Sequence, residues 1–363
     1  MHLEWVEFSD FRNYRSLSLT VASSLNILTG PNAQGKTNLL EGLALLLVGR
    51  SFRGAKPAEL PHWDSTGAVV TGQIRRMETA RPLRRMVSQR EDGAWMVSGE
   101  GCAWARAIPF GWQDLAILTN GPQARRNFLD GFAGKLYPAH LTALNRYRQI
   151  LARRNHLLQG GLDLATLKER IAPWNEQLVR VGFELLSRRR TAAASLGAEA
   201  ARLYPQLAGE GQVRLEYRCA LGPNPTEANF VEALEGRLAD EQRRGQTLSG
   251  PHRDDLLIEV DGRDLRTFGS RGQQRLMALA LRLAEAGPVA EAVGSNPVLL
   301  LDDALSELDP AVQRRVLEHI AGAGQVFLTT ADAALPDVGT AAWWEVRGGQ
   351  VTDMTPAATR GAA

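Results

Sequence analysis

The stretch GPNAQGKT, from Gly30 to Thr37, lies between a short apolar run, LNILT, and a helix-forming run, KTNLLEGLALLLVG. It fits the pattern G-x-x-x-x-G-K-[ST] in the strand-loop-helix context of a phosphate-binding loop. There the backbone N–H groups surround the phosphates, Lys36 reaches the β and γ groups, and the Thr37 hydroxyl binds Mg²⁺. This context favours a nucleotide site over a chance glycine-rich turn. The predicted nucleotide-binding residues are Gly30, Pro31, Asn32, Ala33, Gln34, Gly35, Lys36 and Thr37.

A second stretch, PVLLLDD from Pro297 to Asp303, has the pattern of a buried strand that ends in two carboxylates. The carboxyl ends of strands form the ligand-binding edge of an open α/β sheet. We therefore expect Asp302 to complete the Mg²⁺ shell, and Asp303 to orient or deprotonate the attacking water. A strand followed by a helix-capping Asp is a common alternative. The phosphate loop elsewhere in the chain favours catalysis, with Asp303 and Lys36 as the catalytic residues.

A third stretch, FGSRGQQRLMALALRLAEAG from Phe268 to Gly287, begins with small polar residues and continues as an apolar helix. A helix N-terminus carries unpaired N–H groups and a partial positive charge. Ser270 and Gly272 are therefore suited to hold an anion. Since the phosphate loop lies far upstream, the chain has two candidate anion sites.

Length and composition indicate a globular protein of two domains. The 363 residues exceed the usual size of one hydrophobic core, and 44% hydrophobic with 23% charged residues excludes disorder. A net charge of +2 does not by itself indicate a nucleic-acid partner. Cys102 and Cys219 lack metal-ligand spacing. With neither a signal-peptide core nor an apolar stretch long enough to span a bilayer, we expect a cytoplasmic protein without a membrane partner.

The order of strand and helix patterns predicts an α/β fold of two parts. Alternating segments from Val69 to Val97 indicate an antiparallel sheet lobe. We expect residues 1–120 and 245–363 to form one nucleotide-binding head, and residues 121–244 to form an inserted, mainly helical arm.

Apolar residues of the arm recur at alternating spacings of three and four. This 3.5-residue repeat predicts a short antiparallel coiled coil with the preceding helix, through a turn at Gln159 to Asp163. A buried helix in a bundle is an equal alternative. Pro173 predicts a break or kink, whereas an unbroken segment from Leu164 to Leu207 would extend roughly 66 Å. The repeat consists of Leu164, Leu167, Ile171, Trp174, Leu178, Val181 and Leu185.

A phosphate loop, a Ser-x-Gly-Gln helix start and paired acids followed by SELD, in this order, resemble the head of an ABC-type ATPase. The resemblance assigns Ser270, Gly272 and Gln273 to the signature motif, with Arg271 and Gly272 where transporters carry Gly-Gly. It assigns Ser306 and Asp309 to the D-loop. The resemblance implies a mixed sheet core beside the antiparallel lobe. In that class the signature faces the nucleotide of a second head, so the resemblance also implies a symmetric dimer.

Further motifs resemble the RecF family of bacterial recombination mediators. They are FRNYRSLSL from Phe11, NGPQARRNFLD from Asn120, LSGPHRDDL from Leu248 and LLLDDALSELD from Leu299. The resemblance implies an ATPase that binds ATP and Mg²⁺, dimerises on ATP and hydrolyses it slowly. It further implies binding to double-stranded and gapped DNA, and the loading of RecA at single-strand junctions together with RecO and RecR.

Four residues are candidate nucleotide sensors through these resemblances. Gln113, in FGWQDL, is the candidate γ-phosphate sensor, although the RecF family reads Pro-Glu-Asp-Leu there. Thr330 follows the last strand, where transporters place a switch histidine. Arg12 and Asn13 lie near the nucleotide by analogy with related DNA-repair heads, and surface residues are an equal alternative.

The first arm helix is strongly basic. Seven Lys or Arg residues and one acid, Asp130, occur between Gly121 and Gly160, whereas the next fifty residues hold seven basic and six acidic residues. A basic stripe is typical of phosphate contacts, and a solvated helix face is at least an equal alternative. Arg125 and Arg126 belong to a family motif and could be structural instead. The candidate DNA-binding residues are Arg146, Arg148, Arg153 and Arg154.

Three other functions compete with an ATP-switched DNA clamp. A nucleotide-binding subunit of a transporter is one alternative. Against it, this chain has no switch histidine after the last strand and has a long helical insertion between the phosphate loop and the signature. A chromosome-structuring head would have a much longer coiled coil. A scaffold that binds ATP without hydrolysing it would make no use of Asp303.

Overall fold

The computed structural model describes residues 1–331, 335 and 340–356. The chain divides into two compact units. The first unit comprises Met1–Leu115, Gln206–Gly209 and Arg275–Ala363, and the second comprises Ala116–Pro205 and Glu210–Gln274.

The first unit contains a mixed six-stranded sheet. Five strands run parallel and only β14 is antiparallel to its neighbour, which confirms the predicted mixed sheet. The parallel strands end at one edge, where Thr29 and Leu301 lead into the phosphate loop and the acid pair. The strand order is β14 (Gln350–Asp353), β13 (Ala342–Arg347), β3 (Leu25–Thr29), β12 (Val326–Thr329), β11 (Val298–Leu301) and β7 (Ala107–Phe110).

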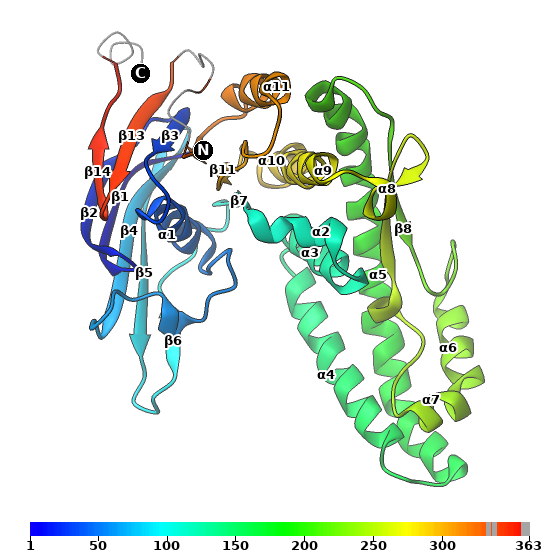
Figure 1. Cartoon of the computed structure of the whole chain (residues 1–363). Coiled ribbons are helices and arrows are strands. Elements are labelled where there is room, and N and C mark those ends of the chain that lie inside the picture. The colour runs from blue at the N-terminus through cyan, green and yellow to red at the C-terminus, as the bar shows by residue number, and fades with distance from the viewer. Residues whose placement is uncertain (332–334, 336–339, 357–363) are drawn as a thin grey trace. The chain divides into compact units, whose positions relative to one another are not determined.

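An antiparallel five-stranded sheet forms the predicted lobe of the first unit. Helix α1 (Lys36–Val48) lies between the two sheets (Figure 1), and its leucines share one hydrophobic core with both. Gly42 permits this close approach, because a Cβ there would lie 2.3 Å from the Phe8 ring. The strand order is β2 (Tyr14–Thr20), β1 (His2–Phe11), β4 (Gly67–Arg76), β5 (Thr79–Gln89) and β6 (Trp95–Ser98).

The first unit contains further helices besides α1. Helix α9 (Arg271–Ala284) contains the signature segment, and its residues from Arg275 onward belong to this unit. The other elements are η1 (Pro57–Glu59), η2 (Trp112–Leu115), α10 (Ala286–Val293) and α11 (Pro310–Ala321).

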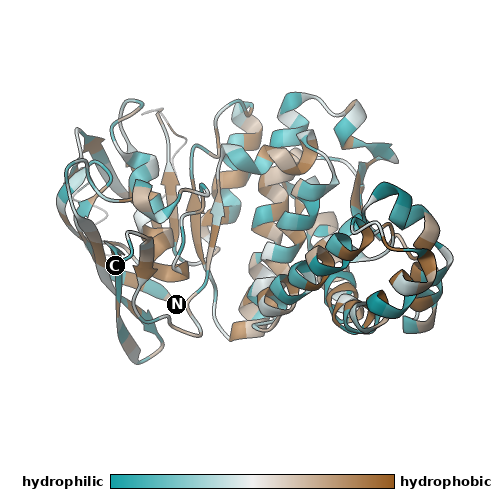
Figure 2. Cartoon of the chain, turned by 90° about the horizontal axis from the view of Figure 1, so that it is seen from below, coloured by the Kyte–Doolittle hydropathy of each residue, from teal (hydrophilic) through white to brown (hydrophobic). Residues whose placement is uncertain are grey.

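The second unit combines a helical arm with a three-stranded sheet. Helices α4 and α5 pack side by side, and α6 and α7 contribute Phe230, Leu234 and Leu238 to the same cores (Figure 1). Figure 2 shows both hydrophilic and hydrophobic turns along the helices, as amphipathic packing requires. The helices are α2 (Ala116–Thr119), α3 (Pro122–Leu136), α4 (His140–Leu158), α5 (Leu164–Ala208), α6 (Glu227–Gly236), α7 (Leu238–Arg244), η3 (Pro251–Arg253) and α8 (Leu265–Phe268).

Strand pairing explains where the second unit ends. Strands β8 (Val213–Arg218), β9 (Asp255–Val260) and β10 (Arg263–Asp264) form one antiparallel sheet, so residues 255–264 join this unit. The second unit therefore ends at Gln274 and not at the expected residue 244, since the pairing of β9 with the distant β8 leaves no local signal in the sequence.

The predicted break at Pro173 is wrong, because α5 continues through this residue. Pro173 lies on the exposed side of the helix, between the buried Ile171 and Leu178. The seam of the 3.5-residue repeat is buried from Leu167 onward except at the partly buried Trp174, so tertiary packing holds the helix across the lost hydrogen bond. At 1.5 Å per residue the helix extends roughly 67 Å.

No helix in the part of the chain that the structure describes is long and apolar enough to cross a membrane.

Candidate nucleotide site and nucleic-acid interface

The phosphate loop has the backbone of an anion cradle. Gly30, Ala33 and Gly35 have φ values of 137°, 65° and 118°, and such left-handed positions direct successive N–H groups to one side. A Cβ at Gly30 would lie 2.3 Å from the Val346 carbonyl oxygen, so only glycine fits there. Gly35 leads into α1, whose first-turn N–H groups complete the cradle.

Lys36 is held at the base of this loop. Its Nζ donates hydrogen bonds to the carbonyl oxygens of Gly30 at 2.5 Å and Pro31 at 2.8 Å. Burial lowers the pKa of Lys36, while the negative charges of Asp303 and Asp302 act to raise it. The ammonium group is therefore positioned beside the loop before any phosphate arrives.

Asp302 faces Thr37, and the predicted role of both residues in holding Mg²⁺ stays a prediction. The Thr37 hydroxyl lies 2.9 Å from both carboxylate oxygens, and the Thr329 hydroxyl donates to Asp302 at 2.8 Å. Burial raises the pKa of Asp302, against the lowering effect of both hydroxyls. A hydroxyl and a carboxylate in contact are the hard oxygen donors that Mg²⁺ prefers, so these residues fit the predicted ion.

Asp303 lies next to an arginine that the sequence analysis did not single out. The carboxylate of Asp303 is exposed, and its backbone has a φ of 52°. Arg275, in α9, donates from one terminal nitrogen to the Asp303 carbonyl oxygen and to the Ser306 hydroxyl, both at 2.5 Å. Arg275 therefore fixes the turn that presents Asp303 and the D-loop residue Ser306.

These groups surround a pocket of about 470 Å³. Lys36, Arg53 and Arg275 contribute three positive charges and Asp302 and Asp303 two negative ones, which suits a multiply charged phosphate ligand. Arg53 joins the wall from the segment after α1, and Trp112 joins it from the start of η2, next to the candidate Gln113. The lining residues are Asn32, Ala33, Gly35, Lys36, Thr37, Asn38, Arg53, Trp112, Arg275, Asp302, Asp303 and Thr329.

Comparison with known proteins decides the family. A protein described as "DNA replication and repair protein RecF" from Bacillus subtilis (strain 168) is 35% identical over 91% of this chain and 93% of the relative. The chain belongs to the RecF family. A RecF from Synechococcus sp. (strain JA-3-3Ab) is also 35% identical, over 98% of the chain and 96% of the relative. A family model described as "Protein of unknown function (DUF2813)" matches residues 1–52.

Solved structures agree with this membership. The chain matches one described as "Structure of the recombination mediator protein RecF-ATP in RecFOR pathway" with a TM-score of 0.83 and 27% identity, over 98% of both chains. An Smc head bound to the C-winged helix domain of ScpA matches with a TM-score of 0.58 at 14% identity, covering 99% and 100% of the two chains, which shows the fold alone. The fold is that of an ABC-type ATPase head, and the chain is an ATPase of the RecF family rather than a transporter subunit.

The structure places two predicted sensors of this RecF-family chain at the phosphate loop and α1. The Asn13 side-chain amide donates to the Gln34 carbonyl oxygen at 3.0 Å, so Asn13 supports the loop. Arg12 forms two hydrogen bonds of 2.8 Å with the buried Glu41 in α1. Neither belongs to the described wall of the pocket, and their role as sensors stays a prediction.

The other two sensors lie beside pocket residues. Gln113 donates to the Phe52 carbonyl oxygen at 3.3 Å, while its neighbour Trp112 lines the pocket. Thr330 is buried and its backbone N–H donates to Leu28, whereas Thr329 joins the pocket. Their roles also stay predictions. Successive side chains at a strand end point to opposite faces, so only one of Thr329 and Thr330 faces Asp302. The sequence alone does not show which one, because this depends on how the strand lies in the sheet.

The signature residues and the D-loop residue Asp309 lie at helix starts, whereas Ser306 lies in the turn before α11. The Ser270 hydroxyl accepts from the Gln273 backbone N–H at 3.2 Å, and the Gln273 side chain accepts from the Ser270 N–H at 2.9 Å. Gly272 has nothing within 4 Å of its Cβ position, so that side of the turn is open. Asp309 caps α11 by accepting from the N–H groups of Ala311 and Val312, both at 3.0 Å.

Three of the four arm arginines are exposed on α4. Arg146, Arg148 and Arg153 lie on the solvent side, and α4 contains no acidic residue. The prediction of Arg154 as a DNA contact is wrong, because its side chain is fully buried. It donates to Glu241 at 2.6 Å and to Asn175 and Thr247, so it holds α4, α5 and the segment after α7 together.

Proposed function

We propose that this chain is an ATP-switched DNA-binding protein of recombinational repair. The proposal rests on one observation: the intact phosphate loop and acid pair enclose one pocket in a chain of the RecF family. ATP is the proposed substrate, since the similar solved structures are described as RecF-ATP and RecF-ATPrS. The relatives' description as DNA replication and repair proteins supports the pathway.

The chain's own groups suggest how hydrolysis proceeds. Lys36 and the loop N–H groups hold the β and γ phosphates, and the exposed Asp303 carboxylate accepts the proton of the attacking water. Thr37 and Asp302 would hold Mg²⁺, which neutralises phosphate charge when it is bound. Arg275 holds the Asp303 turn in place through the carbonyl oxygen of Asp303.

A complete site is proposed to need two copies of the chain. Ser270, Gly272 and Gln273 present an open helix start with N–H groups suited to a phosphate. In an ABC-type dimer this start completes the phosphate loop of the other copy across a two-fold axis. ATP then joins two heads, and slow hydrolysis separates them.

DNA and the other recombination proteins are the proposed partners. The exposed arginines of α4 fit the phosphate backbone of double-stranded or gapped DNA, without a base-reading element. The similar RecF-ATP structure is described as part of the RecFOR pathway, which supports RecR and RecO as partners, with RecA loaded at single-strand junctions. These roles place the protein with DNA in the cytoplasm.

Sedimentation with and without ATP and gapped DNA tests the composite site. Wild type is expected to sediment as a dimer only with ATP, and Ser270→Arg to remain monomeric while still binding ATP. The arginine would fill the open turn and block the partner's phosphate. Dimers of Ser270→Arg at the wild-type ATP concentration would contradict the composite site, and a wild type unaffected by ATP would contradict the switch.

Salt dependence tests the arm as the DNA contact. Replacement of Arg146, Arg148 and Arg153 by Gln is expected to weaken DNA binding and to reduce the slope of log K against log salt by about 0.9 per lost phosphate contact. The matched control is Arg202→Gln in α5, where the arginine is already paired with Glu199. An unchanged slope in the triple variant would exclude α4 as the contact.

A further inference from the structure

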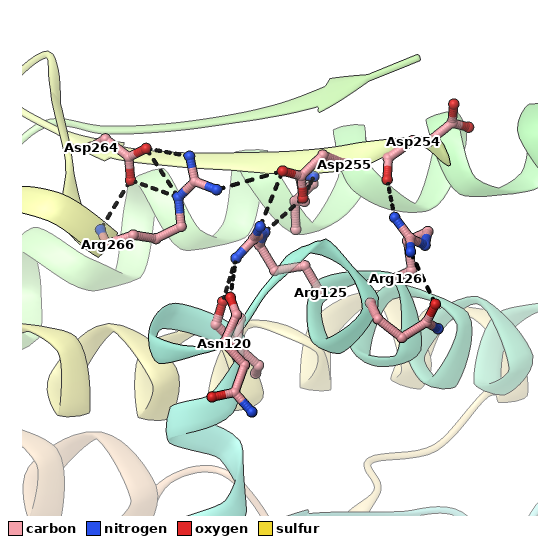
Figure 3. Close-up of polar contacts among 10 residues, drawn as sticks. Asn120, Arg125, Arg126, Asp254, Asp255, Asp264 and Arg266 are labelled. Atoms are coloured by element: carbon pink, nitrogen blue, oxygen red, sulfur yellow. Dashed lines mark hydrogen bonds and ion pairs between the residues drawn. The ribbon is translucent and has the colours of Figure 1, made fainter. Parts of the chain in front are cut away.

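Two sequence motifs of the second unit lie against each other, although more than a hundred residues separate them. Arg125, from the motif at Asn120–Asp130, forms a two-pronged ion pair with Asp255, from the motif at Leu248–Leu256 (Figure 3). The two bonds measure 2.6 Å and 3.0 Å. This pair joins the first helix of the arm to the start of β9.

Arg125 is a fixed structural support. Its side chain is 1% exposed, and it also donates to the Asn120 carbonyl oxygen at 2.8 Å. Its neighbour Arg126 donates to the Asp254 carbonyl oxygen at 2.6 Å (Figure 3). A buried guanidinium with these partners holds β9 rigidly against α3.

Asp255 extends the contact to a third element. Arg266, in α8, lies 3.5 Å from the second oxygen of Asp255 (Figure 3). Arg266 also bonds to both oxygens of Asp264, which caps α8 by accepting from the Arg266 N–H at 2.9 Å. Burial by itself would raise the pKa of Asp255, but the hydrogen bond of Arg125 and the charges of Arg125 and Arg266 hold it below its usual value.

Helix α8 in turn carries the signature segment. The Leu265 carbonyl oxygen accepts from the Gly269 N–H at 3.1 Å and from the Gln274 side chain at 3.0 Å. A Cβ at Gly269 would lie 2.5 Å from the same oxygen, so the chain turns tightly there. Ser270 is exposed and bonds only within its own turn, to Gln273, among the described side-chain contacts. The position of Ser270 therefore depends on α8.

We infer that Arg266, held by Asp255, is a positioning residue that fixes Ser270 for the phosphate bound by the partner copy. The inference rests on the proposed composite site. An anion-binding turn must be held within about 0.5 Å to act on a reacting phosphate. Arg266 connects the turn to the rigid Arg125–Asp255 pair. This connection gives a role to the two motifs at Asn120–Asp130 and Leu248–Leu256, which contribute no residue to the described wall of the nucleotide pocket.

The Arg266→Gln variant tests this role. Arg266 is 29% exposed and the Arg125–Asp255 pair does not include it, so we expect the variant to keep this pair and to fold. We expect ATP affinity of the monomer within twofold of wild type, because Lys36 and the phosphate loop are intact. ATP-dependent dimerisation and kcat should each fall about tenfold, and Arg266→Lys should recover part of both. Arg263→Gln, at an exposed arginine of β10 with no ion pair in the described residues, is the matched control.

Mixing two variants shows whether Arg266 acts on the other copy. A dimer of Arg266→Gln with Lys36→Met has one site with an intact loop and an intact signature. The mixture should therefore hydrolyse ATP several-fold faster than the sum of its components. A parallel mixture of Ser270→Arg with Lys36→Met should gain in the same way.

Each outcome decides between the proposals. If the hydrolysis rate rises when Ser270→Arg is mixed with Lys36→Met but not when Arg266→Gln is mixed with Lys36→Met, the role of Arg266 is overturned and the composite site stands. Equal losses in Arg263→Gln and Arg266→Gln would also overturn it. No gain in either mixture would overturn the composite site and this inference with it.

Discussion

Substitution of Lys36 by methionine is expected to weaken ATP binding about 100-fold, which corresponds to about 2.8 kcal/mol. The lysine Nζ is already aligned by the Gly30 and Pro31 carbonyl oxygens. A charged hydrogen bond to a phosphate contributes about 1.5–3 kcal/mol, and methionine supplies neither the charge nor the donor. Titration calorimetry with ATP measures the change directly.

The control for Lys36→Met is Lys56→Met. Lys56 is an exposed lysine of the first unit and does not line the pocket. It should bind ATP as wild type does, and thermal unfolding should show that both variants are folded. An ATP affinity of Lys36→Met equal to that of wild type would contradict the phosphate loop as the nucleotide site.

Replacement of Asp303 by asparagine is expected to lower the rate of ATP hydrolysis by about 10²–10⁴-fold while ATP still binds. Asparagine tolerates the left-handed backbone that Asp303 adopts at a φ of 52°, so the turn should keep its shape. The amide cannot accept the proton of the attacking water. Dimers that form on ATP should therefore accumulate, which sedimentation detects beside a phosphate-release assay.

Glu318→Gln is the matched control for Asp303→Asn. Glu318 is an exposed acid of α11 and does not belong to the described pocket wall. It should release phosphate at the wild-type rate and should not accumulate dimers. An unchanged rate of phosphate release in Asp303→Asn would remove Asp303 from the proposed mechanism.

Local patterns identified the segments that line the pocket, and their roles as a nucleotide site stay predictions. Gly30 to Thr37 and Asp302 occur where the sequence analysis placed them, at the carboxyl ends of β3 and β11. The antiparallel lobe followed from strand patterns, and the mixed sheet followed from the resemblance to an ABC-type head. Such features depend on the order of neighbouring residues, so the sequence alone can predict them.

Residues that reach the pocket from distant segments were not found in advance. Arg275 lies in the predicted helix α9 and Trp112 lies beside the candidate Gln113, yet neither position revealed that the side chain reaches the pocket, and Arg53 belongs to no quoted motif. The pairing of Arg125 with Asp255 likewise required the fold, although both lie in motifs that the sequence analysis quoted. A charged residue in a motif does not reveal whether its partner is phosphate, DNA or another side chain.

The arm shows most clearly which properties of a residue cannot be predicted from the sequence. Arg153 and Arg154 are adjacent and identical in type, yet one is exposed and the other is fully buried against Glu241. The sequence by itself determined the phosphate loop and the acid pair, because contiguous residues form them. Only the tertiary structure decided which arginines meet solvent and which threonine meets Asp302, because burial depends on contacts between segments far apart in the chain.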